Sequence, residues 1–156
     1  MDETQVIIRK AASADVAAIK VCVEASLEAT YGGLWTSEPL VAGDDDWASA
    51  WVACAAGEII GVGLSEGHVV SDLWIHPSEQ GHGAGTALLA ALEGEIVARG
   101  FALAKLRCLE TNLKSRAFYR SRGWTEVRVY PHETIPLNTV DMTKSVAQEG
   151  EAELMN

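Results

Sequence analysis

The sequence predicts one mixed α/β domain, of the α+β kind, with a mostly antiparallel central sheet of about six or seven strands. Three strand-like segments separated by turn residues between positions 51 and 75 predict an antiparallel meander. After them, two stretches with helical spacing alternate with strand-like segments, which adds a parallel pair of strands. A hydrophobic content of 48% over 156 residues suits one core.

The N-terminal segment predicts a strand followed by a helix. Residues 6–8 form a short β-branched run, and Asp15 precedes a row of apolar residues at helical spacing that ends near Tyr31. Residues 33–49 contain proline, glycine and three adjacent aspartates, so we expect an irregular connection, with a short helix near Pro39 as one option. Adjacent acids are more typical of a solvated turn than of a metal site.

The meander and the segments after it follow in order. The three meander strands are predicted at residues 51–55, 58–64 and 68–75, and Pro77 ends the last one. Leu88, Leu92 and Ile96 repeat every four residues and predict a helix that closes at Gly100. The remaining elements are expected to be a strand over 101–109, a helix capped by Thr111 and Asn112 and ended by Gly123, and strands over 124–130 and 135–142.

The two ends of the chain and its cysteines limit the class of protein. Residues 145–156 are acidic and contain no aromatic residue, which favours a flexible tail after a single domain over 1–144. The first ten residues contain acids and no long apolar run, so we expect no signal peptide, no membrane span and a cytoplasmic location. Cys22, Cys54 and Cys108 are far apart in apolar contexts and are expected to be reduced core thiols.

Charge is distributed unevenly along the chain. The net charge of −10 disfavours nucleic acid or an anionic membrane as a partner. Residues 105–128, however, have a net charge of +5, against −15 for the rest of the chain. These basic residues either form ordinary solvated faces or contribute to a local anion site, and the sequence leaves both readings open.

A glycine-rich segment follows the third meander strand and leads into a helix. This order predicts an anion site, because the first N–H groups of a helix lack intrahelical partners and attract negative charge. A P-loop is excluded, because residues 75–99 contain no lysine. A dinucleotide fingerprint is disfavoured, because Thr86 occupies the position of its last glycine or alanine and the strands upstream are antiparallel.

Residues 80–85 have the form Arg/Gln-x-x-Gly-x-Gly/Ala and directly follow a strand. Residues 112–124 have the form Asn-x-x-Ala/Ser-x-x-x-Tyr-x-x-x-Gly-Phe/Trp. Together they resemble the GNAT superfamily of N-acetyltransferases, and the order of elements matches from about Val6 to Val140. The resemblance implies a central sheet with helices on both faces, acetyl-CoA as co-substrate and no metal.

The resemblance also implies roles for individual residues. Tyr119 matches the general acid of the family, and Asp72 or Glu110 would act as the base, directly or through water. Asn112, Ser115 and Tyr119 share one helix face. The residues expected to bind acetyl-CoA are Leu73, Trp74, Ile75, Gln80, Gly81, His82, Gly83, Ala84, Gly85, Thr86, Asn112, Ser115, Tyr119 and Arg122.

The implied reaction is direct transfer of an acetyl group to a primary amine of a small molecule or peptide. The acidic remainder of the chain favours a cationic acceptor. The resemblance also makes a homodimer one option for the assembly, since many relatives form dimers, but no feature of the sequence fixes an interface. A non-catalytic acyl-CoA sensor on the same fold is the alternative, and propionyl-CoA or succinyl-CoA are alternative donors.

Overall fold

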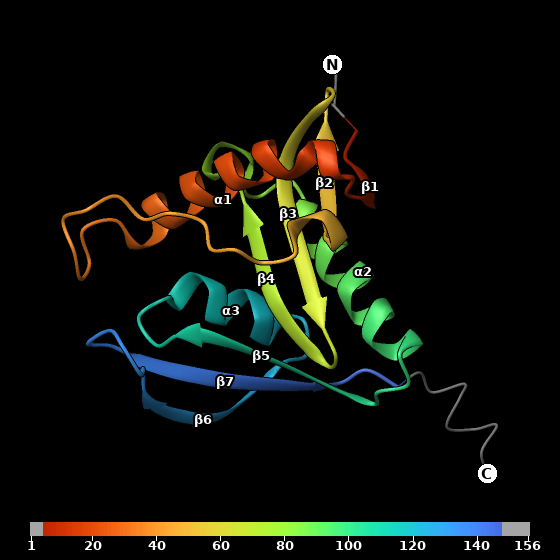
Figure 1. Ribbon diagram of the computed structural model, residues 1–156. Coiled ribbons are helices and arrows are strands. Elements are labelled where there is room, and N and C mark those ends of the chain that lie inside the picture. The colour runs from red at the N-terminus through yellow and green to blue at the C-terminus, as the bar shows by residue number, and fades with distance from the viewer. Residues whose placement is uncertain (1–4, 148–156) are drawn as a thin grey trace, which may run out of the picture. The chain divides into compact units, whose positions relative to one another are not determined.

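The computed structural model describes residues 5–147, which form a seven-stranded sheet with three α-helices (Figure 1). The order of the strands in the sheet is β1-β2-β3-β4-β5-β7-β6. The strands are β1 (Ile7–Lys10), β2 (Trp51–Ala55), β3 (Glu58–Glu66), β4 (Val69–Ile75), β5 (Leu103–Leu109), β6 (Thr125–Pro131) and β7 (Asn138–Ser145). The helices are α1 (Val16–Tyr31), α2 (Ala84–Ala98) and α3 (Leu113–Ser121), with short 3-10 helices at η1 (Ser13–Asp15), η2 (Trp47–Ser49) and η3 (Pro77–Glu79).

The predicted fold class is confirmed. The β1–β2, β2–β3, β5–β7 and β6–β7 pairs are antiparallel. The pair of β4 with β5 is parallel, with Val69 opposite Lys105 and Val70 opposite Leu106. This parallel pair requires a crossover connection, which α2 supplies between the two strands.

The described chain folds as two compact units. The first contains residues up to Ser65 together with Asp72–Leu92, and the second contains Glu66–Ser71 and the residues from Glu93 onward.

In the first unit, α1 and α2 cover opposite faces of the sheet. Val52 of β2 belongs to a buried cluster with Ile19 of α1, whereas its neighbour Ala53 belongs to a cluster with Leu88 of α2. This alternation is the period of two that a strand buried on both faces requires. On the α2 face of β3, a Cβ added at Gly61 would lie 2.7 Å from Ile75 Cδ1. The absence of a side chain there allows close packing.

In the second unit, β7 lies between β5 and β6. Alternate residues of the central strands are fully buried, among them Ala104, Leu106, Val140 and Met142. Gly100 ends α2 with a φ of +95°. Phe101 and Gly100 donate their N–H groups back to Ile96 and Val97. This is a Schellman termination, which explains why β5 begins at Leu103 and not at Phe101.

Two local predictions were wrong. The connection after α1 has no helix near Pro39, and the 3-10 helix within it is η2 at Trp47–Ser49. β7 runs over Asn138–Ser145 and not over 135–142. Its later start has a local cause, since Leu137 donates to the carbonyl of Ile135 and His132 donates to the carbonyl of Leu137, closing a tight loop. Most of the predicted tail, residues 148–156, lies outside the described residues.

Within residues 5–147, no helix is both long enough and apolar enough to cross a membrane. No group of three or more His, Cys, Asp or Glu side chains in this range is placed to hold a metal ion.

Candidate acyl-CoA site

The end of β4 is anchored by hydrogen bonds to one carbonyl group. The carbonyl oxygen of Ile75 accepts from the hydroxyl of Ser26 at 2.8 Å and from the side-chain amide of Gln80 at 3.3 Å. Ser26 is a buried residue of α1. The last residue of the strand is thereby tied both to α1 and to the start of the glycine loop.

The glycine loop adopts a backbone conformation that requires glycine at two positions. Gly81 and Gly83 have φ values of +88° and +87°, in the left-handed region that other residues rarely adopt. A Cβ at either position would have no protein atom within 4 Å. Glycine is therefore favoured at positions 81 and 83 by the backbone conformation and not by crowding from other protein atoms. The space in front of the backbone is open at both positions.

Helix α2 begins directly after Gly83. Ala84 is its first residue, and Ala87 donates its N–H to the carbonyl of Gly83 at 3.1 Å. Gly85 and Thr86 belong to the first turn of the helix. Gly85 therefore lies in the helix and not in the loop before it. Residues 81–83 are exposed and lead directly into the first turn of α2, whose N–H groups lack intrahelical partners, and this arrangement is typical of phosphate sites.

Asp72 is a partly buried carboxyl group on β4. Its Oδ1 accepts a hydrogen bond from the indole N–H of Trp74 at 3.0 Å. Its Oδ2 is buried and has no hydrogen-bond partner among the described residues. Burial and the neighbouring carboxyl of Asp45 raise the pKa of Asp72 to about 8, against a smaller lowering by the Trp74 N–H. Asp72 is therefore a carboxyl that gains or loses a proton near neutral pH.

Tyr119 is a buried residue of α3. Its ring makes edge contacts with Phe118 and Trp124, at centroid distances of 5.3 and 6.1 Å. Only 8% of the residue is exposed. Aromatic contacts on two sides fix the orientation of the phenol ring, which is useful for a group that must donate a proton in one direction.

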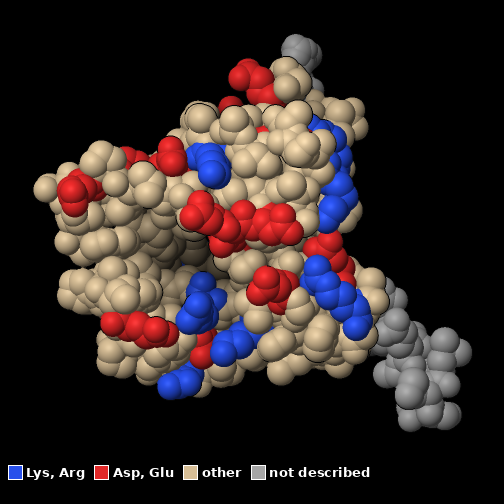
Figure 2. Space-filling model, in the orientation of Figure 1, with Lys and Arg blue, Asp and Glu red and all other residues tan. Residues whose placement is uncertain are grey.

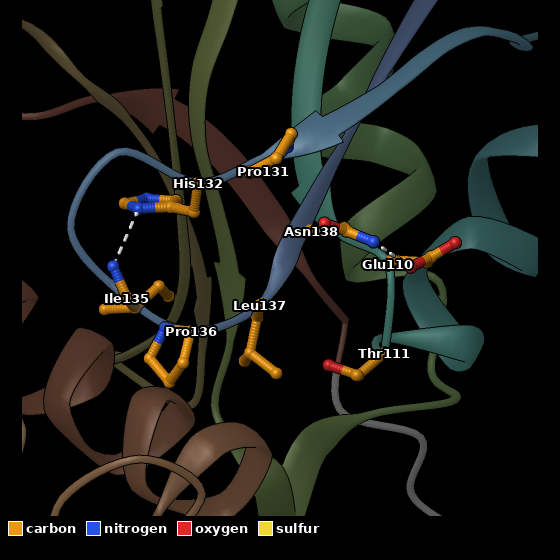
Figure 3. Close-up of a pocket in the computed structure, with 8 residues that line it drawn as sticks. All are labelled: Glu110, Thr111, Pro131, His132, Ile135, Pro136, Leu137 and Asn138. Atoms are coloured by element: carbon orange, nitrogen blue, oxygen red, sulfur yellow. Dashed lines mark hydrogen bonds between the residues drawn. The ribbon is translucent and has the colours of Figure 1, made fainter.

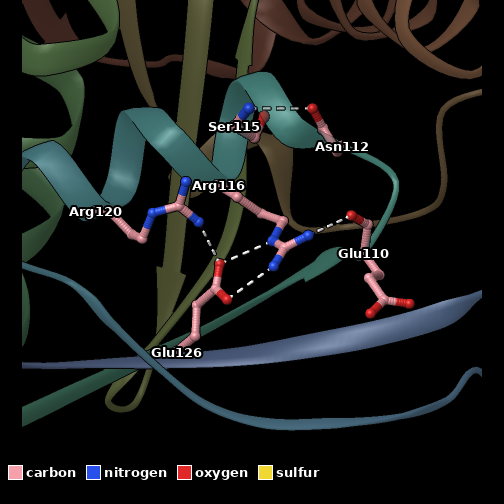
Figure 4. Close-up of polar contacts among 6 residues, drawn as sticks. All are labelled: Glu110, Asn112, Ser115, Arg116, Arg120 and Glu126. Atoms are coloured by element: carbon pink, nitrogen blue, oxygen red, sulfur yellow. Dashed lines mark hydrogen bonds and ion pairs between the residues drawn. The ribbon is translucent and has the colours of Figure 1, made fainter.

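Asn112 and Ser115 begin α3. The Asn112 side chain accepts the N–H of Ser115 at 3.1 Å, so it is the N-cap of the helix (Figure 4). The hydroxyl of Ser115 has no hydrogen-bond partner among the described residues. Asn112 thus has a clear structural role whether or not it contacts a ligand, whereas the Ser115 hydroxyl has none within the described chain.

Three of the seven basic residues in 105–128 form ion pairs within the second unit. Arg116 and Arg120 both bind the carboxylate of Glu126 at 2.8 Å (Figure 4), and these contacts lower the pKa of Glu126 to about 2. Lys105 lies 3.5 Å from Asp141. Figure 2 shows basic side chains beside acidic ones over α3 and β5 to β7. For these three basic residues, ion pairing and not an anion site is the structural explanation.

Arg122 was expected to contact the phosphates of coenzyme A. Its guanidinium lies over the Phe118 ring, 3.8 Å from the centroid, and donates to the carbonyl of Phe118. The side chain therefore folds back along α3.

Glu110 lies just after β5, at the polar end of a pocket (Figure 3). Its N–H donates to the carbonyl of Asn138, and Asn138 donates its side-chain N–H to Oε1 of Glu110 at 3.0 Å. The pocket has a volume of about 460 Å³ and is otherwise lined by Thr111 and the loop between β6 and β7.

The predicted site residues thus form two groups. Those from Asp72 to Thr86 belong to the first unit, around the end of β4 and the start of α2. Those from Glu110 to Arg122 belong to the second unit, around α3. Sequence reasoning missed Ser26 and Asp45. Ser26 has a sequence signal, because it is a polar residue on the apolar face that Ile19 and Val23 define.

Known proteins are similar to this chain in both sequence and structure. A mycothiol acetyltransferase of Amycolatopsis mediterranei (strain U-32) is 40% identical over 65 residues, which make up 38% of this chain and 21% of that protein. The match therefore spans about a fifth of that relative.

Solved structures share the fold over nearly the whole chain. A GCN5-related N-acetyltransferase from Rhodopseudomonas palustris has a TM-score of 0.73 and 22% identity, over 93% of this chain and 98% of that one. YncA of Salmonella typhimurium, described as a putative acetyltransferase and solved with its cofactor acetyl-CoA, has a TM-score of 0.71 and 20% identity, over 94% and 96% of the two chains. At these identities the likeness shows the fold alone.

The sequence profile of the acetyltransferase (GNAT) family matches residues 21–124. This range covers more than half of the chain and includes α2, the glycine loop and α3. The chain belongs to the acetyltransferase (GNAT) family.

Proposed function

We propose that this protein binds acetyl-CoA with its pyrophosphate on residues 80–86 and transfers the acetyl group directly to a primary amine. The observation that carries the proposal is the left-handed conformation of Gly81 and Gly83 immediately before α2, with open space in front of both. Family membership and the acetyl-CoA bound to the similar YncA structure support it.

Residues of this chain fit the donor molecule in two places. N–H groups at the start of α2 suit the phosphates, since the helix dipole adds to their attraction. The unpartnered hydroxyl of Ser115 suits an amide of the pantetheine arm. We keep Asn112 and Arg122 as secondary contacts, because both side chains already have partners within α3.

The proposed reaction requires the protein to stabilise the developing negative charge, to protonate the departing thiolate and to remove a proton from the amine. The nitrogen of the amine forms a bond to the carbonyl carbon, and the carbon–sulfur bond of the thioester breaks. Backbone N–H groups of residues 73–75 would stabilise the negative charge that develops on the carbonyl oxygen. Tyr119 would give a proton to the departing thiolate.

The amine must lose a proton, and Asp72 suits this step better than Glu110. A general base works best when its pKa lies near the working pH, and burial places the pKa of Asp72 at about 8. Glu110 accepts a hydrogen bond from Asn138 and lines a separate pocket within the second unit. We therefore assign the base to Asp72, acting directly or through water.

The test is release of free coenzyme A by the purified full chain, measured against a panel of primary amines with acetyl-CoA, propionyl-CoA and succinyl-CoA. The proposal expects amine-dependent release, fastest with acetyl-CoA. Tight binding of acetyl-CoA without release for any amine would instead support a non-catalytic acyl-CoA sensor.

A further inference from the structure

The carboxyl groups of Asp45 and Asp72 come from separate segments of the first unit and lie against each other. Asp72 is on β4, and Asp45 is on the connection between α1 and β2, with its side chain within hydrogen-bonding reach of the Asp72 carboxyl. Oδ1 of Asp72 accepts from the indole N–H of Trp74, whereas Oδ2 is buried and has no donor among the described residues. Ionised carboxylates only accept hydrogen bonds, so a hydrogen bond between these two groups requires a proton on one of them.

No cation takes the place of that proton in the described part of the chain. Asp45 forms no ion pair with a described lysine or arginine, and it is the charged group that acts on the Asp72 carboxyl. The other acidic side chains around the connection have partners of their own. Glu24 and Glu28 of α1 each accept a backbone N–H group of the connection, and Asp46 accepts the hydroxyl of Ser49.

Residues 43–46 form an exposed segment next to a buried tryptophan. Trp47 is 2% exposed, and its indole N–H donates to the carbonyl of Gly43 at 3.0 Å. Its backbone N–H donates to the carbonyl of Asp45 at 2.8 Å. The contact of Asp45 with Asp72 ties this segment to β4, and the indole of Trp47 is a reporter of its conformation.

We propose that Asp45 and Asp72 share one proton and that this proton fastens residues 43–46 to β4, which makes Asp45 a positioning residue for Asp72. Loss of the proton leaves two adjacent carboxylates, which repel each other and release the segment. Because burial and the Asp45 carboxyl raise the pKa of Asp72 to about 8, the segment is fastened below this pH and released above it.

The consequence for catalysis rests on the proposed function, in which Asp72 is the base. Asp72 can then take a proton from the amine only when the segment is released. The shared proton itself does not depend on the proposed function, because it follows from the contact between the two carboxyls.

The test follows the indole N–H resonances of Trp47 and Trp74 by NMR from about pH 6 to about pH 10, on the full chain without acetyl-CoA or amine. Trp74 reports the charge of Asp72, to which its indole is hydrogen-bonded, and Trp47 reports the segment through its bond to Gly43. We expect both resonances to move with one midpoint near pH 8. A Trp47 resonance that stays in place while that of Trp74 titrates, or no transition at either, would overturn the proposal.

Asp45→Asn replaces the shared proton by a permanent donor, since the amide of asparagine can donate to the ionised Asp72 carboxylate. The Trp47 resonance should then stay in place over the whole pH range. The midpoint at Trp74 should move down by about one pH unit or more, because a neighbouring negative charge is lost. Asp72→Asn should remove the transition near pH 8 from both resonances.

Asp44→Asn is the matched control, because Asp44 is an exposed acid of the same segment that does not act on the Asp72 carboxyl. Its titration should equal that of the unmodified chain. A Trp47 transition near pH 8 that persists in Asp45→Asn or Asp72→Asn, or that disappears equally in Asp44→Asn, contradicts the shared proton. Since neither donor nor acceptor is present, this outcome is independent of coenzyme A release, which tests the proposed function.

Discussion

At the scale of single residues, Asp72 and Tyr119 are assigned opposite proton transfers, and their surroundings differ accordingly. Asp72 is surrounded by groups that favour its protonated form, chiefly through burial and the nearby carboxyl of Asp45. Tyr119 is held by aromatic rings at a fixed orientation. The sequence could place both residues by motif and strand position, but not the Asp45 neighbour, because 27 positions separate the two aspartates in the chain.

We expect Asp72 to make the free energy of unfolding depend on pH. Its pKa is about 8 when folded and 3.8 for an ordinary aspartate, so between these values the folded chain holds a proton that the unfolded chain has released. Stability therefore falls as pH rises through this window, and the fall ends above the folded pKa. Urea unfolding at several pH values should show this decline in the unmodified chain and a smaller one in Asp72→Asn.

Asp44→Asn is the matched control, because Asp44 is an exposed acid of the same loop as Asp45. It should retain the decline of the unmodified chain. A decline of equal size in Asp72→Asn would show that Asp72 does not hold this proton.

Tyr119→Phe should lower kcat by about 100-fold or more, which is the usual contribution of a general acid. Phenylalanine keeps the ring that packs on Phe118 and Trp124, so the affinity for acetyl-CoA should change little. Steady-state rates and calorimetry on the same preparation measure both quantities. Turnover equal to that of the unmodified chain on a good acceptor would remove Tyr119 from the acid role.

At the scale of elements, the glycine loop joins a strand to the start of a helix. Sequence reasoning identified the loop because glycine spacing is a local property. Gly85 belongs to the same motif but lies in the first turn of α2, which begins at Ala84. Gly61 was also missed as a packing residue, because the contact of β3 with α2 joins segments that are distant in the sequence.

Gly83→Val should abolish measurable binding of acetyl-CoA. Valine at a φ of +87° costs about 1–3 kcal/mol of backbone strain, and relief of this strain moves the N–H groups of the loop. The domain should remain folded, because folded domains have about 5–15 kcal/mol of stability. Calorimetric titration with acetyl-CoA, together with urea unfolding, measures the two effects.

Gly94→Ala provides the comparison for this variant. Gly94 lies on the exposed side of α2 and a Cβ there meets no protein atom within 4 Å. Alanine should stabilise the helix by up to about 1 kcal/mol and leave acetyl-CoA binding unchanged. Unaltered affinity in Gly83→Val would contradict the phosphate role of the loop.

At the scale of the whole molecule, the net charge bears on the acceptor, and the fold determines which basic residues are paired. The net charge of −10 is the feature of the sequence from which we predict a cationic acceptor. Three of the seven basic residues in the segment 105–128 are paired inside the second unit, since Glu126 binds two arginines and Asp141 binds Lys105. Counting charges along the chain could not reveal this pairing, because one partner of Lys105 lies 36 positions away.

The order of elements was predictable because periodicity and turn residues are local signals. Strand, helix, meander and crossover all formed where apolar spacing placed them, within a few residues. The start of β7 was not predictable in the same way. It depends on the closed loop at His132, in which a side chain accepts two backbone N–H groups.

In the most direct test of acetyl transfer to an amine, the full chain is incubated with a primary alkylamine and with acetyl-CoA labelled in its acetyl group. The products are then identified by mass spectrometry. The account predicts that the label appears on the amine nitrogen, with one free coenzyme A thiol formed for each labelled amine. Labelled acetate as the only product, or bound acetyl-CoA that stays intact with every amine, would contradict it.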